Sequence, residues 1–164
     1  MFTWRPESNK FPITPTTSSP TAAGPNWQAL GASPTLAANM AAFAYRMQAL
    51  GHELCFVQIW RSYAQQNALY AQGRTTPGKK VTDARPFQSA HCAMIDGLPA
   101  SQAFDVAPRI DDRIYWPMDE TTQRFWSDAR DSGRMLGLVW GATFNTPPRD
   151  FGHFQLSTFK KAAQ

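Results

Sequence analysis

Apolar residues recur at helical spacing in the segment that follows Ser33 and Pro34. These positions are Leu36, Met40, Phe43, Met47 and Leu50. Such spacing gives a helix one core-facing side, a proline is tolerated in the first turn, and the following Gly51 is a typical stop signal. The pattern therefore predicts a helix of about 16 residues packed on the core.

Two more helices are predicted by capping residues followed by helical patterns. Ser62 can cap a second helix that runs to about Gly73, with Ala64, Ala68 and Leu69 on one side. A third helix begins after the predicted cap at Asp119 and ends near Gly137.

Short β-prone runs lie between and after these helices. Residues 54–60 predict a buried strand, and residues 74–88 predict a loop. Further strands are predicted at residues 102–107, 114–116, 138–140 and 153–156. Helices grouped early and late around short strands indicate an α+β domain with a mostly antiparallel sheet.

The first 34 residues differ in composition from the rest of the chain. Residues 1–34 are rich in Pro, Thr, Ser and Ala, a composition that does not fold alone. We expect either a flexible tail or an arm that wraps across the domain, and the aromatic residues favour wrapping. These are Phe2, Trp4, Phe11 and Trp27. The remaining residues, 35–164, are predicted to form one domain.

Composition limits the classes of function. A chain of 164 residues with 43% hydrophobic content suits one core, and we expect a monomer. No apolar run approaches the roughly 20 residues that span a bilayer, so stable membrane insertion is not expected. The net charge of +4 is scattered, without a basic helix, which argues against nucleic acid as a partner. The N-terminus lacks the layout of a signal peptide, which predicts synthesis in the cytoplasm.

The chain contains three histidines, and two of them stand near aspartates. His91 and His153 bracket Asp105, and Asp150 precedes His153 by three residues. A catalytic zinc needs three protein ligands and an open position for water, and imidazoles with one carboxylate serve well. A second carboxylate beside the metal can take the proton of the water. From the spacing alone, ordinary polar histidines and surface aspartates remain an equal alternative.

Motifs along most of the chain resemble one peptidase family. The order Ser-x-His, Ala-x-Asp and Asp-x-x-His resembles zinc peptidases that include phage L-alanyl-D-glutamate endopeptidases and the D-Ala-D-Ala carboxypeptidase-like (VanY) enzymes. Residues 60–75 (WRSYAQQNALYAQGRT) are similar to a block of the same family, Tyr-Arg-Ser … Gln … Leu-Tyr-x-Gln-Gly-Arg-Thr. The Gln-Gly-Arg-Thr part favours the endopeptidase branch. The resemblance implies a Hedgehog/DD-peptidase-like single domain, with a small antiparallel sheet flanked by helices.

The resemblance also implies roles for individual residues. His91, Asp105 and His153 would bind Zn²⁺, and Asp150 would act as general base and later as proton donor. Arg61 would stabilise the substrate carbonyl or the developing oxyanion. The implied supporting residues are Ser89, which would hydrogen-bond within the ligand loop, and Gln66, a helical polar group near the cleft. Trp140 is the tryptophan that we expect to line the cleft.

The metal carboxylate is where the chain departs from the family pattern. Asp105 follows His91 by fourteen residues, a longer interval than the family has, and residues 92–104 look like a lengthened loop. Asp96 is therefore a rival ligand, although Asp96-Gly97 is typical of a turn whereas Asp105 stands in an alternating run. Cys92 is a weaker rival because adjacent strand residues face opposite ways. We expect His52 at a surface or capping position.

The resemblance implies hydrolysis of the peptide stem of peptidoglycan at the L-Ala–D-Glu bond. A phage endolysin that acts at the cell wall or periplasm would fit the N-terminus. Two alternatives stay open: a D,D-carboxypeptidase or dipeptidase that trims D-Ala termini, and a non-catalytic wall-binding module on the same fold. Arg74 and Arg109 can be carboxylate-binding groups for an acidic peptide or ordinary surface charges.

Overall fold

The computed structural model describes residues 25–145 and 149–161. Within them, helices, strands and 3-10 turns (η) follow in this order: α1 (Pro34–Ala49), β1 (Leu54–Gln58), α2 (Tyr63–Ala71), η1 (Pro86–Gln88), η2 (Ala90–Cys92), β2 (Met94–Ile95), β3 (Leu98–Pro99), β4 (Ala103–Ile110), β5 (Arg113–Ile114), α3 (Glu120–Met135), β6 (Leu138–Trp140), η3 (Gly141–Thr143) and β7 (His153–Leu156). The predicted α+β class is confirmed.

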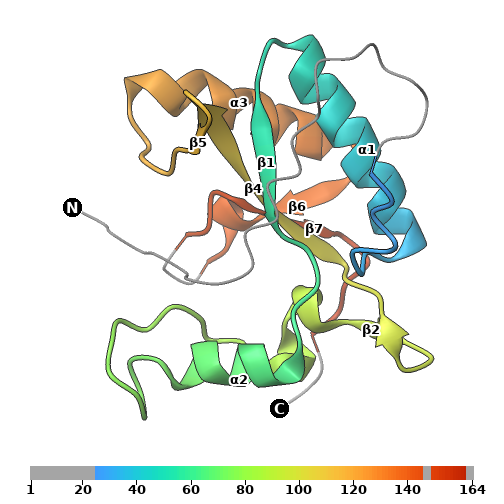
Figure 1. Cartoon of the computed structure of the whole chain (residues 1–164), viewed down its shortest axis with the longest axis vertical. Coiled ribbons are helices and arrows are strands. Elements are labelled where there is room, and N and C mark those ends of the chain that lie inside the picture. The colour runs from blue at the N-terminus through green and yellow to red at the C-terminus, as the bar shows by residue number, and fades with distance from the viewer. Residues whose placement is uncertain (1–24, 146–148, 162–164) are drawn as a thin grey trace.

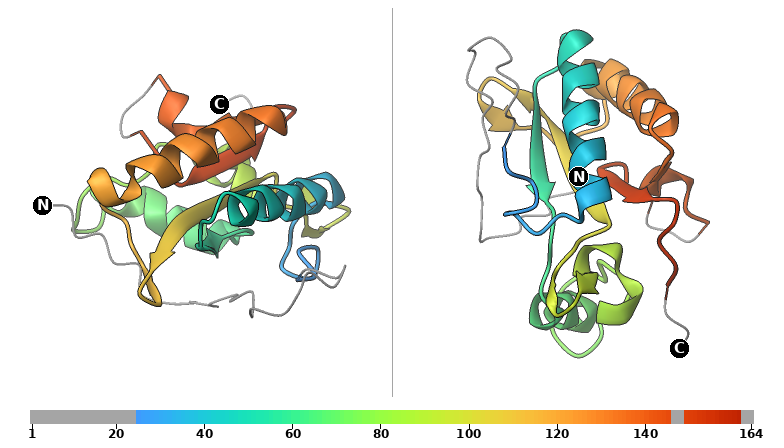
Figure 2. Two further views of the ribbon diagram at one scale, coloured as in Figure 1. Left: turned by 90° about the horizontal axis from the view of Figure 1, so that it is seen from above. Right: turned by 90° about the vertical axis from the view of Figure 1, so that its right-hand side faces the viewer.

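An antiparallel sheet forms the middle of the molecule. Its strands lie in the order β1-β4-β7-β6, with β5 paired to the far end of β4. Figures 1 and 2 show α1 and α3 side by side near this sheet, while α2 lies apart from them with η1 and η2. The sheet therefore has one face packed against two helices and another that looks toward α2.

The helix-covered face holds the aromatic core. Phe104 in β4 and Phe154 in β7 are cross-strand partners whose rings stack at 5.6 Å, and Phe43 from α1 packs against both. Because successive strand residues face opposite sides, Asp105 and His153 must point away from this core. The register that buries the phenylalanines thus presents a carboxylate and an imidazole together on the other face.

The predicted caps form. The Ser33 side chain accepts a hydrogen bond from the amide of Leu36, Ser62 makes a capping box with Gln65, and Asp119 accepts from the amide of Thr121. Each cap satisfies an amide that the first helical turn leaves unpaired. The helix starts predicted from the sequence are therefore confirmed.

The structure corrects three expectations about local structure. Ala64 and Ala68 in α2 are exposed, and the residue of this helix that is buried is Gln66. Residues 92–104 are more than a loop, because β2 and β3 pair as a hairpin within them. His91 and Cys92 lie in a 3-10 turn rather than a strand, so strand alternation was the wrong argument against Cys92 as a ligand.

The predicted arm falls mostly outside the described residues. Residues 1–24, with Phe2, Trp4 and Phe11, are not described, so their arrangement stays a prediction. Trp27 is described and buried, and its ring lies 4.7 Å from that of Phe56. In the described part of the chain, no helix has both the length and the apolar content to cross a membrane.

Gly133 in α3 is predicted to be essential for packing of the helix on the sheet. A Cβ at this position would lie 2.6 Å from the ring of Phe154, which is fully buried and cannot swing aside. Alanine would gain about 1 kcal/mol of helix propensity. The overlap is expected to exceed this gain, so Gly133→Ala should destabilise the fold by about 1–3 kcal/mol in urea denaturation. An unchanged or higher free energy of unfolding would contradict this account of the contact.

Candidate metal centre and active site

Three side chains from separate elements bring their donor atoms together. His91 Nε2, His153 Nδ1 and Asp105 Oδ1 lie 3.1 Å from one another in each pairing. They come from η2, β7 and β4, and both imidazoles are buried. Among the described residues this is the group of His, Cys, Asp and Glu side chains whose geometry could hold a metal ion.

The hydrogen bonds on the outer nitrogens orient both imidazoles. His91 Nδ1 lies 2.7 Å from the carbonyl oxygen of Ile59, and His153 Nε2 lies 3.1 Å from Oε1 of Gln155. Both partners accept hydrogen bonds, so each of these nitrogens carries the proton. In the neutral rings, His91 Nε2 and His153 Nδ1 therefore present lone pairs to each other and to Asp105.

This convergence fits a cation. Two lone pairs and a carboxylate about 3 Å apart repel one another unless a positive charge lies between them. Zinc takes imidazole nitrogen and carboxylate oxygen at about 2.0–2.2 Å, so one ion can be shared by these three donors. Outer hydrogen bonds of this kind are the usual support of metal-binding histidines.

The pKa shifts show the same electrostatic coupling. Burial alone would raise the pKa of Asp105, but the charges and hydrogen bonds of His91 and His153 outweigh it and hold that pKa well below its usual value. Burial alone would lower the pKa of His153, whereas the hydrogen bond and negative charge of Asp105 raise it overall. The cluster is thus built to bind positive charge.

A guanidinium approaches the metal-facing carboxylate from the end of β1. Arg61 Nη2 lies 3.9 Å from Asp105 Oδ2, and Arg61 Nη1 donates to Gln66 Oε1 at 2.8 Å. The Gln66 amide is fully buried and donates to the carbonyl of Ala84 at 2.7 Å. A buried amide is tolerated only when it is bonded, and these bonds fix the guanidinium beside the site.

Asp150 lies at the entrance to β7, in a turn that two glycines make possible. A Cβ at Gly141 would lie 2.5 Å from the Asp150 carbonyl oxygen and 2.9 Å from Cβ of His153, and one at Gly152 would lie 2.9 Å from the Val106 carbonyl oxygen. Partial removal from water raises the pKa of the Asp150 carboxyl group, and the negative charge of Asp105 raises it further. A carboxyl group with a raised pKa suits proton transfer.

Ser101, which was not predicted from the sequence, braces the 3-10 turn that carries His91. The buried Ser101 hydroxyl lies 2.9 Å from the Ile59 carbonyl oxygen, which also accepts from His91, and 2.7 Å from that of Ala103. Ser89, the expected support, accepts a hydrogen bond from the amide of Cys92 through its carbonyl oxygen. Ser101 gave no sequence signal because it belongs to no recognised motif.

Two rival ligands lie elsewhere. Asp96 is exposed at the turn of the β2–β3 hairpin with a φ of 50°. The Cys92 thiol points toward Gln66 Oε1 at 3.9 Å, and burial raises its pKa. His52 also lies outside the cluster, because its Nε2 is 2.7 Å from Oδ2 of Asp128 in α3. This contact ties the end of α1 to α3, which is more than the surface or capping position expected.

The structure does not place Trp140 with the ligands. Trp140 is the cross-strand partner of Phe154, and its ring stacks on that core residue. Its Nε1 donates to the Phe151 carbonyl oxygen, and it lines a cavity of about 410 Å³ with residues of α3. His153 directly precedes Phe154 in β7, so it points to the opposite face of the sheet from Phe154 and its partner Trp140. The expectation that Trp140 lines the metal-site cleft is therefore not met.

The fold and the site define a class of protein: an α+β domain in which two strands of the sheet and a 3-10 turn bring a His-Asp-His group together. Comparison with solved structures agrees. The L-Ala D-Glu endopeptidase ChiX of Serratia marcescens has the same fold, with a TM-score of 0.52 and 19% identity over 80% of this chain and 85% of that chain.

A protein that is similar in sequence is also an L-alanyl-D-glutamate endopeptidase. The peptidoglycan L-alanyl-D-glutamate endopeptidase CwlK of Bacillus subtilis (strain 168) is 28% identical over 110 residues, which are 65% of this chain. The match spans 62% of the length of that relative. No protein-family model matches the chain. The resemblance to L-alanyl-D-glutamate endopeptidases that the motifs predicted is confirmed by the similarity to CwlK, and the predicted fold by the similarity to ChiX.

Proposed function

We propose that this protein is a zinc-dependent endopeptidase that hydrolyses the L-Ala–D-Glu bond in the peptide stem of peptidoglycan. The observation that carries the proposal is the convergence of His91 Nε2, His153 Nδ1 and Asp105 Oδ1 on one point. CwlK and ChiX are both L-alanyl-D-glutamate endopeptidases, which supports the choice of bond.

The residues around the three ligands divide the chemical work. Zinc held by His91, Asp105 and His153 would supply a water molecule of lowered pKa and would polarise a carbonyl group. The Asp150 carboxylate accepts the proton of the attacking water and returns it to the leaving amine. The Arg61 guanidinium, held by Gln66, donates to the carbonyl oxygen as negative charge develops there. Ser101 and Ile59 keep His91 in place.

The finer biological role is part of the same proposal. The similarity of the Gln-Gly-Arg-Thr block at residues 72–75 to the phage enzymes supports an endolysin that is made in the host cytoplasm and acts at the wall. The chain would act as a monomer. The alternatives are a carboxypeptidase that releases D-Ala and a module that binds the wall without cleaving it.

Digestion of purified peptidoglycan tests the proposal. The zinc-loaded protein is expected to release new amino-terminal D-Glu, which mass spectrometry of the products identifies. Release of free D-Ala without new D-Glu termini would instead establish the carboxypeptidase. Binding to the wall without any product, at a full equivalent of zinc, would favour the binding module.

Gln66 is predicted to act through Arg61. Gln66→Leu leaves the guanidinium without its acceptor, so kcat should fall by roughly ten- to a hundredfold while zinc content is kept. In an Arg61→Ala background, Gln66→Leu should lower kcat little further, because the guanidinium through which Gln66 acts is already absent. Fully additive losses in this double-mutant cycle would show that Gln66 does not act through Arg61.

A further inference from the structure

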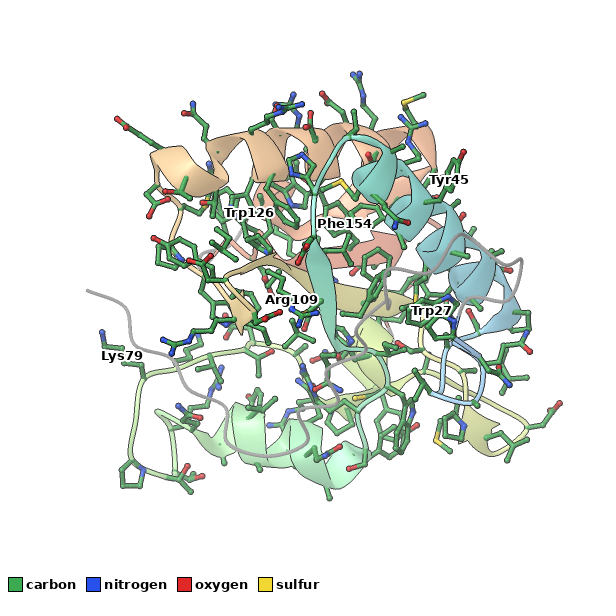
Figure 3. All side chains as sticks on the ribbon, turned by 45° about the horizontal axis from the view of Figure 1, so that its top comes forward. Trp27, Tyr45, Lys79, Arg109, Trp126 and Phe154 are labelled. Atoms are coloured by element: carbon green, nitrogen blue, oxygen red, sulfur yellow. The ribbon has the colours of Figure 1, made fainter. Side chains whose placement is uncertain are left out.

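A second arginine lies on the same sheet face as the metal-facing carboxylate. Along β4, residues Asp105, Ala107 and Arg109 alternate with Phe104, Val106 and Pro108, and the alternation sets the first three on the face away from the aromatic core. At about 3.3 Å per residue, Arg109 is about 13 Å along the strand from Asp105. Figure 3 shows Arg109 between the sheet and α2.

The carboxylate that Arg109 contacts is exposed, so a substrate carboxylate can compete for the guanidinium. The Arg109 side chain is 17% exposed, and the partner that it contacts is Asp112, at 2.6 Å, whose side chain is 88% exposed. An ion pair with so exposed a carboxylate contributes little, because water and salt screen it. A substrate carboxylate could replace Asp112 at small cost.

Arg74, the other candidate in the sequence, is used structurally. Its Nη1 donates to the carbonyl oxygens of Tyr70 and Thr82 at 2.6 and 2.9 Å, and its Nη2 contacts Asp83 at 2.7 Å. Its guanidinium also stacks 4.0 Å from the ring centre of Tyr70. These bonds hold the loop at residues 74–83 against α2. The Arg74 guanidinium therefore has fewer donors left for a substrate carboxylate than that of Arg109.

Resting on the proposed function, we propose that Arg109 is a specificity-determining residue that binds a carboxylate of the stem peptide two or three residues beyond the scissile bond. On the glycan side of that bond, the lactyl carboxyl group is consumed in an amide. Beyond it, the peptide carries free carboxylates on the γ-linked D-Glu next to the bond, on an acidic third residue and at its end. The last two are the ones far enough from the bond to reach Arg109. An extended peptide covers the 13 Å between the two strand positions in about four residues, and the long Arg109 side chain shortens the span that the peptide must cover to two or three. A peptide whose carboxyl end runs toward Arg109 therefore brings these carboxylates within its reach.

The test compares synthetic stem peptides that differ in one carboxylate. The peptides are L-Ala-γ-D-Glu-L-Lys-D-Ala, the same peptide as its C-terminal amide, and the peptide with meso-diaminopimelate as third residue. Arg109→Gln is compared with Arg113→Gln, which removes an exposed arginine of strand β5. Arg113 pairs with Ile110, and the Ile110 side chain lies on the opposite face of β4 from Arg109. Asp112→Asn removes the competing carboxylate, and asparagine tolerates the φ of 61° found there.

The expected result is a rise in KM of roughly tenfold for Arg109→Gln on the peptide with the recognised carboxylate. The difference in KM between Arg109→Gln and wild type disappears on the peptide that lacks the recognised carboxylate. If it disappears on the amide, the terminal carboxylate is bound; if it appears with meso-diaminopimelate and not with L-Lys, the carboxylate of the third residue is bound. Arg113→Gln stays at the wild-type KM. Asp112→Asn lowers KM on the recognised peptide.

Two outcomes would overturn the inference alone. Arg109→Gln could match Arg113→Gln on every peptide, or it could lower kcat equally on all of them, as a general structural defect would. Wild-type protein that holds zinc but cleaves none of the peptides, nor intact peptidoglycan, would instead overturn the proposed function, and the inference with it.

Discussion

Replacing Asp150 with asparagine is expected to lower kcat for stem-peptide hydrolysis by a factor of about 10²–10⁴ while zinc content stays unchanged. Asparagine keeps the size of the side chain and the turn between Gly141 and Gly152, but it cannot accept the proton of the attacking water. Desolvation of its carboxyl group and the charge of Asp105 raise the pKa of Asp150, which would help the carboxyl group to return that proton to the amine.

Asp96→Asn is the matched control for this substitution. Asp96 is an exposed aspartate of the β2–β3 turn, and asparagine accommodates its positive φ. We expect wild-type kcat and zinc content from this variant. Steady-state kinetics on one stem peptide and zinc analysis of the same protein samples decide the comparison. An Asp150→Asn variant with wild-type kcat would remove Asp150 from the mechanism.

Loss of the metal-facing carboxylate is expected to abolish zinc binding and activity together. Asp105→Ala leaves His91 and His153 as a two-ligand site, which is too few for the usual three-ligand catalytic zinc. Zinc at a hundred times its Kd should stabilise the wild-type protein by about 2.7 kcal/mol and raise its Tm. The variant should show no such zinc-dependent shift, and its hydrolysis should fall to the background rate.

Calorimetry with and without added zinc measures this stabilisation, and chelation of the wild-type protein should reproduce the loss of activity. Asp96→Asn again serves as control, because Asp96 was the rival ligand in the sequence and asparagine accommodates its positive φ. A zinc-dependent rise in Tm that disappears in Asp96→Asn and persists in Asp105→Ala would reverse the assignment of the metal carboxylate.

Much of the fold was predictable because its signals are local. The caps at Ser33, Ser62 and Asp119 and the apolar spacing of α1 act within a few residues, so the sequence marked the helix starts correctly. The alternation around residue 105 also marked β4. The β2–β3 hairpin was missed because its strands are two residues each and its apolar residues are exposed.

The candidate residues of the site came from histidine contexts and from motif resemblance, but their arrangement did not. A slip of one residue in the pairing of β4 with β7 would turn either Asp105 or His153 toward the core and separate the two side chains. The burial of Gln66 in a helix that looked apolar on its alanine side depends on Arg61 and Ala84, which are distant in sequence. Trp140 lies on the core face for the same reason of register.

The sequence by itself determined the helices, the strands of the main sheet, and the histidines and aspartates from which the site is drawn, since residue type and local spacing are enough for those. The tertiary structure decided that Asp105 and not Asp96 joins His91 and His153, which nitrogens of the two imidazoles are free, and which arginine is left available. These choices depend on strand register and on hydrogen bonds between distant segments, and neither is encoded in any local pattern.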